Sequence, residues 1–243
     1  MKLLRYAFIV TALAWLGAWY QTRSLPGLGQ MRPELLQEPK QGETGRKEFG
    51  FAHRGVDYAV RPVASYELYG LVVTHNNTTG LADLTHDENS LDTKDLCVIW
   101  GANLRNEDYR RIIYESTPTW CHASWHSSDI RFDMAALANN HLVTDRDDLR
   151  AALERVHVGD QVRFKGLLVN YRDQRYPDAW RISSTKRTDS MGGACEVVFF
   201  EELEVLQAHA SGAWMLRRML PWVVGTLAIL TLIVAVSTTP RMN

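Results

Sequence analysis

The sequence has little cysteine: Cys97, Cys121 and Cys195 are the three in a chain of 243 residues. So few cysteines exclude a disulfide-dense scaffold, and an odd number means that one cannot pair within the chain. The sequence also lacks a C-x-x-C pair and an H-E-x-x-H motif. Because these are common signatures of zinc sites, we predict no metal and no cofactor.

An excess of charge of one sign is also missing, since 27 Lys and Arg stand against 28 Asp and Glu. A formal net charge of −1 gives no overall field that would attract nucleic acid or an anionic surface. Nucleic acid is therefore not an expected partner, and any electrostatic site must be local.

Long apolar runs are present at both ends of the chain. Residues 1–20 carry Lys2 and Arg5 and then an uncharged stretch long enough to cross a bilayer, which predicts a signal-anchor helix. A cleaved signal peptide is the alternative. Residues 215–238 form a second apolar run, with Pro221 expected in the first turn of a transmembrane helix. The lipid bilayer is the partner expected for both helices.

Two spans would place both termini on one side of the membrane. The basic residues that flank the spans do not decide which side that is. The start "MKLLR" before an apolar run is typical of an export signal, which favours a periplasmic location for the middle of the chain. A domain that faces the cytosol as a scaffold is the alternative.

The middle of the chain changes character near residue 57. Residues 21–56 are rich in Pro and Gly and predict a flexible tether. Residues 57–208 contain alternating and apolar runs typical of strands, with one short amphipathic helix at 145–156. We predict a mainly β domain with one short helix. An OB-like Greek-key barrel, with its helix between the third and fourth strands, fits this order. A sandwich-like β domain with one helix is the alternative.

Five segments between residues 57 and 206 resemble a known group of proteins. They read "YELYGLVVTH", "DLCVIWGANL", "LANNHLV", "GDQVRFKGLLVNY" and "RISSTKRTDSMGGACEVVFFEEL". In this order they are similar to a family of uncharacterised bacterial membrane-anchored proteins with one β-rich domain. The resemblance implies a bacterial inner-membrane protein and assigns no catalytic residue. The chain departs from the family pattern at Ala138 and Ser190, where Ser and Gly are common.

The cysteines differ in their sequence settings. Cys97 lies in an apolar strand pattern, whereas Cys121 and Cys195 lie in turn-like sequence. We predict a Cys121–Cys195 disulfide in an exported domain, which would add about 4 kcal/mol to stability by the loop-entropy model.

Two short stretches are candidates for ligand binding. Lys186, Arg187 and Asp189 crowd beside paired glycines, more closely than a turn requires. Asn140 and His141 lie in "LANNHLV", which we interpret as a turn.

Catalysis is a weaker hypothesis, because each candidate lacks part of its signature. Ser183 and Lys186 match S-x-x-K but lack the rest of that motif. Cys195 could act with a histidine. A metal site could use the following residues: Cys121, His75, His86, His122, His126 and His141. We therefore predict a non-catalytic binding or assembly module that works with other envelope proteins. The alternative is a membrane-tethered hydrolase that uses Cys195 or a His-bound metal.

Overall fold

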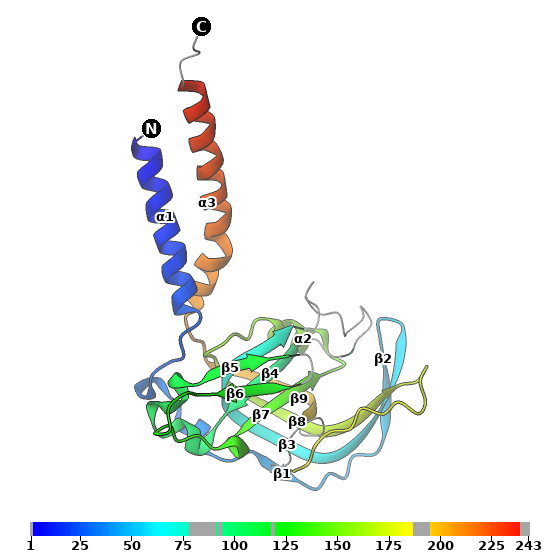
Figure 1. Ribbon diagram of the computed structural model, residues 1–243. Coiled ribbons are helices and arrows are strands. Elements are labelled where there is room, and N and C mark those ends of the chain that lie inside the picture. Colours follow the sequence, from blue (N-terminus) through cyan, green and yellow to red (C-terminus); the bar gives the residue numbers. More distant parts are fainter. Residues whose placement is uncertain (1, 78–90, 92–93, 118–119, 187–194, 239–243) are drawn as a thin grey trace. The chain divides into compact units, whose positions relative to one another are not determined.

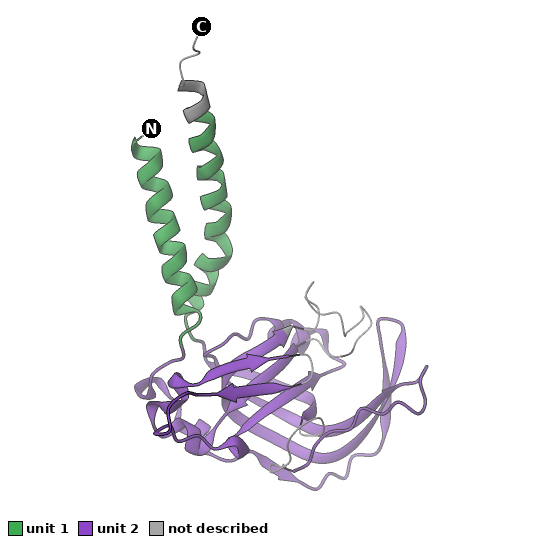
Figure 2. Ribbon diagram, viewed as in Figure 1, with its two compact units in different colours: residues 1–24, 209–243 green, residues 25–208 purple. Residues whose placement is uncertain are grey.

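The computed structural model describes residues 2–77, 91, 94–117, 120–186 and 195–238. The chain divides into two compact units, one formed by residues 1–24 and 209–243 and the other by residues 25–208 (Figure 2). Each unit is described by itself below.

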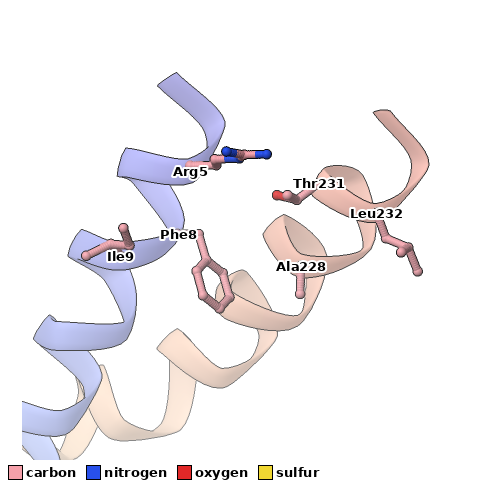
Figure 3. A pocket seen from close by; sticks show the side chains of 6 residues that line it. All are labelled: Arg5, Phe8, Ile9, Ala228, Thr231 and Leu232. Atoms are coloured by element: carbon pink, nitrogen blue, oxygen red, sulfur yellow. The ribbon is translucent and has the colours of Figure 1, made fainter. Parts of the chain in front are cut away.

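The first unit is a pair of apolar helices, α1 (Lys2–Gln21) and α3 (Ser211–Thr238) (Figure 1). Both are long and apolar enough to cross a membrane, as the sequence predicts. Pro221 lies inside α3 and not in its first turn, because α3 begins at Ser211. An open apolar groove between the helices is lined by Arg5, Phe8, Ile9, Ala228, Thr231 and Leu232 (Figure 3).

The second unit is mainly β, which confirms the coarse fold prediction. Its main strands are β1 (Lys40–Gly42), β2 (Phe49–His53), β3 (Val56–Asn77), β4 (Lys94–Ile99), β7 (Leu137–Val143), β8 (Gln161–Asp173) and β9 (Glu196–Gln207). A separate hairpin contains β5 (Ile113–Ser116) and β6 (Cys121–Ser124). Among its described residues, α2 (Asp147–Glu154) is the only α-helix. Five 3-10 helices complete the described elements: η1 (Leu28–Gln30), η2 (Pro33–Leu36), η3 (Gly101–Leu104), η4 (Glu107–Arg111) and η5 (Met134–Ala136).

Five strands pair in a closed cycle. β3 pairs with β4, β4 with β7, β7 with β9, β9 with β8, and β8 returns to β3. The β7–β9 pair is parallel, and the other four pairs are antiparallel. The helix α2 lies in the connection from β7 to β8.

The cycle buries apolar side chains on both faces of β4. Leu96 and Val98 belong to one core cluster, while Cys97 and Ile99 belong to another. Because alternate residues of a strand point to opposite faces, β4 must be covered on both sides. The face of β4 that carries Cys97 and Ile99 is covered by two segments. The N-terminal part of the unit contributes Leu35, and residues 101–135 contribute Tyr109.

The flexible-tether prediction for residues 21–56 is wrong, because residues 25–56 belong to the folded unit. Leu35 is fully buried. The Gln161 side chain donates a hydrogen bond to the Gln30 carbonyl at 2.7 Å and accepts one from the Arg32 N–H at 2.8 Å. This segment covers an apolar face that the strands leave open, so a few apolar side chains are enough to hold it on the domain.

Candidate functional site

The stretch "LANNHLV", predicted as a turn, is strand β7 and is buried from Ala138 onward. It lies between β4 and β9, and this position fixes its extended backbone. Asn140 donates to the carbonyls of Leu96 at 3.4 Å and Ala138 at 3.3 Å, so its amide holds backbone groups. His141 points to the opposite face, because neighbours in a strand alternate.

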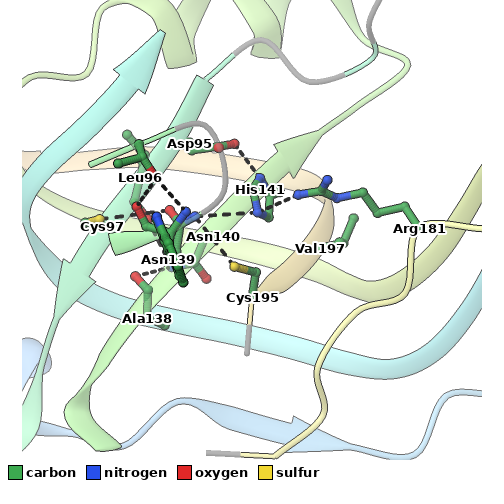
Figure 4. A network of polar contacts seen from close by, with 12 residues as sticks. Asp95, Leu96, Cys97, Ala138, Asn139, Asn140, His141, Arg181, Cys195 and Val197 are labelled. Carbon is green, nitrogen blue, oxygen red and sulfur yellow. Dashed lines mark hydrogen bonds and ion pairs between the residues drawn. The ribbon is translucent and has the colours of Figure 1, made fainter. Parts of the chain in front are cut away.

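His141 is held by a charged partner at each ring nitrogen (Figure 4). Its Nδ1 lies 2.8 Å from Oδ1 of Asp95, and both side chains are fully buried. The two residues are directly opposite in the β4–β7 register, which explains how two strands bring them together. On the other side, the Arg181 guanidinium donates to Nε2 at 2.7 Å. The imidazole therefore bridges a buried carboxylate and a guanidinium.

These neighbours act on the His141 ring in opposite directions. Burial lowers the pKa of His141 and so does Arg181, but hydrogen bonds to Asp95 and Cys195 outweigh them and raise the pKa to about 9. The contact with Arg181 requires the neutral ring, because a protonated Nε2 has no lone pair to accept a hydrogen bond. With Arg181 in contact, Nε2 accepts a hydrogen bond and the ring is neutral. Asp95 and Cys195 favour the protonated ring, which forms when Arg181 moves away from Nε2.

Cys195 completes a row of three reactive side chains. It lies directly before β9, is half-buried, and is one of the neighbours that raise the pKa of His141. The Asn139 amide nitrogen lies 3.8 Å from the Cys195 sulfur and 3.5 Å from Nε2 of His141. A thiol, an imidazole and a carboxylate thus follow one another, which is the order of nucleophile, base and orienting group.

The predicted Cys121–Cys195 disulfide is corrected by the structure. Cys121 pairs instead with Cys97, at a Cα–Cα distance of 5.8 Å. The hairpin strand that carries Cys121 is thereby joined to the covered face of β4, and Cys97 is not a simple core thiol. Asn139 separates Cys195 from this bond, since its Oδ1 lies 3.9 Å from the Cys97 sulfur.

The other predicted ligand residues are not brought to this cluster. Lys186 is exposed, and its N–H donates to the Ser184 hydroxyl at 3.0 Å. Arg187 and Asp189 lie outside the described residues. Ser183 is buried, and its hydroxyl accepts from the Val197 N–H at 3.0 Å and donates to the Ser184 carbonyl at 2.9 Å, so it serves the backbone.

The histidine-metal hypothesis loses one of its proposed ligands. Cys121 is in a disulfide and has no thiolate to offer. In the part of the chain that the structure describes, no group of three or more His, Cys, Asp or Glu side chains is placed to hold a metal ion. His86 lies outside the described residues.

Sequence reasoning missed Asp95 as a member of the site. The signal was weak: an acid at the start of the apolar run "DLCVIWG" looks like an ordinary strand boundary. Only the β4–β7 register shows that it faces His141. No protein-family model, no curated protein and no solved structure matches the chain, so the geometry carries the functional argument.

Proposed function

We propose that this protein is a binding or assembly module of the bacterial envelope, anchored in the inner membrane by its two terminal helices. Two apolar helices of sufficient length support the anchoring. The Cys97–Cys121 disulfide supports a periplasmic domain, because disulfides persist in oxidising compartments. The resemblance to bacterial membrane-anchored proteins is consistent with both.

We further assign the domain to the OB type. The carrying observation is the closed cycle of five strand pairings with α2 between the third and fourth strands of that cycle. OB domains bind ligands on the face of their second and third strands. Here those strands are β4 and β7, which carry Asp95, Asn139 and His141. These three are buried, so a ligand would meet the cluster at Cys195 and Arg181, which are partly exposed. Arg181 reaches this cluster from the segment after β8.

A partner that uses this face should pass close to Ile182, which is 62% exposed and adjacent to Arg181. We expect a photo-crosslinking amino acid in place of Ile182 to capture one discrete envelope protein in living cells. The matched control is the same substitution at Met134, which is 52% exposed in a different segment, η5. Equal crosslinking at both positions, or none at Ile182, would contradict a partner on this face.

A membrane-tethered hydrolase is a second candidate function because one observation favours it. Cys195 lies next to a histidine that is itself paired with a buried aspartate. A simple packing role would not require a thiol, an imidazole and a carboxylate in this order.

A further inference from the structure

We propose that Cys195 is the nucleophile of an acyl-transfer site, with His141 as its base and Asp95 as the residue that positions His141. This inference rests on the second candidate function. Asp95 at Nδ1 leaves Nε2 as the nitrogen that can exchange a proton with the thiol. His141 comes from β7, Asp95 from β4 and Cys195 from the segment that leads into β9, so two neighbouring strands and the start of a third build the row.

The reaction follows from the placement of these groups. The Cys195 proton passes to Nε2 of His141, and the sulfur forms a bond to the carbonyl carbon of an ester or thioester. The resulting oxyanion collapses, the bond to the leaving group breaks, and the leaving group takes the proton from His141. Water then adds to the carbonyl carbon of the Cys195 thioester while His141 accepts one water proton. The C–S bond breaks, and the Cys195 sulfur takes this proton back from His141. The products are a carboxylic acid and the restored thiol.

Asn139 is placed to receive the oxyanion. Its Nδ2 lies close to both the nucleophilic sulfur and the basic nitrogen, at 3.8 and 3.5 Å. A carbonyl oxygen on a substrate bonded to Cys195 would fall near this donor. The side chain is 5% exposed, and a donor in such a poorly hydrated place stabilises developing charge more strongly than one in water.

Arg181 indicates the class of substrate. It donates to Nε2 at 2.7 Å and so occupies the lone pair that the base must use. Its backbone is fixed by a bridge to Tyr171, which leaves the guanidinium as the part that can move. A carboxylate is the stronger partner for a guanidinium. An acyl donor that carries a carboxylate would therefore draw Arg181 away and release His141 to act on Cys195.

The first test measures thiol reactivity in the detergent-solubilised full chain. Cys97 and Cys121 are joined, so one added group per chain reports Cys195. At pH 7 we expect iodoacetate, whose carboxylate can engage Arg181, to alkylate Cys195 at least tenfold faster than it alkylates glutathione. His141→Gln should remove this advantage, whereas His122→Gln, an exposed histidine on β6, should keep it. The comparison with glutathione uses the unaltered protein and holds even if a variant fails to fold. If Cys195 is alkylated no faster than glutathione is, the proposal is overturned.

The second test addresses the substrate class. Mono-4-nitrophenyl succinate carries a carboxylate, and 4-nitrophenyl butyrate is a neutral ester of similar length. We expect faster nitrophenol release and an acyl group on Cys195 with the succinate ester. Arg181→Met should abolish the preference between the esters, and Lys186→Met should preserve it. Equal rates for both esters with the unaltered protein would overturn the role of Arg181. The crosslinking at Ile182 does not depend on either result, so failure of the acyl-transfer site and failure of the binding function are distinguishable.

Discussion

Lys94 shows what burial does to a single residue. It is 2% exposed at the start of β4, and its ammonium donates to the carbonyls of Glu154 at 3.2 Å and Val156. The Glu154 carbonyl ends α2 and the Val156 carbonyl follows it, and a cation at this end interacts favourably with the helix dipole. Burial lowers the pKa of Lys94 to about 8, although Asp160 and Glu154 act in the opposite direction.

The titration of Lys94 predicts how stability depends on pH. The folded protein releases this proton near pH 8, whereas the unfolded chain retains it up to about pH 10.4. The unfolded state binds more protons between these values. Lys94 therefore makes stability rise with pH, by at most about 1.4 kcal/mol per pH unit.

The measurement is denaturant unfolding between pH 7.5 and 10, with Lys94→Met compared with the unaltered chain. The variant should lose the rise in unfolding free energy that Lys94 contributes. Lys165→Met is the matched control, because the Lys165 side chain is 53% exposed and should leave the pH dependence unchanged. The same pH slope in all three proteins would contradict the lowered pKa.

At the scale of elements, η2 shows most clearly that residues 25–56 are folded and do not form a flexible tether. Its two leucines differ sharply: Leu35 is fully buried with Leu71 and Tyr109, while Leu36 is 40% exposed. We expect Leu35→Ala to lower the unfolding free energy by about 2 to 5 kcal/mol, because it leaves a cavity under the segment. Leu36→Ala should cost less than about 0.5 kcal/mol.

Chemical denaturation of the two leucine variants provides the comparison. Equal and small losses would mean that residues 25–36 do not pack on the domain. The pair is informative because the substitutions are chemically identical and adjacent in one 3-10 helix.

At the scale of the whole molecule, the proposed topology fixes the compartment of both ends. With α1 and α3 as spans, we expect alkaline phosphatase fused after residue 208 to be active, since it would be exported through α1. A green fluorescent protein fused after residue 243 should fluoresce in the cytosol. The reverse pattern would place the domain in the cytosol and support the scaffold alternative.

The sequence by itself determined the features that depend on local composition and period. The apolar ends are helices long enough to cross a membrane, and strand periodicity together with one amphipathic segment gave a mainly β domain with a short helix. Each of these properties can be seen within a window of some twenty residues, because backbone hydrogen bonding and side-chain alternation are local.

Tertiary structure alone decided which distant residues meet. Cys97 pairs with Cys121 because a hairpin covers the outer face of β4, and no period in the sequence shows that this face is covered. His141 meets Asp95 through strand register, and a shift of one residue would have turned either side chain to the other face. The candidate site is therefore formed by strand pairing between segments far apart in the chain. Local sequence patterns do not show which distant segments pair.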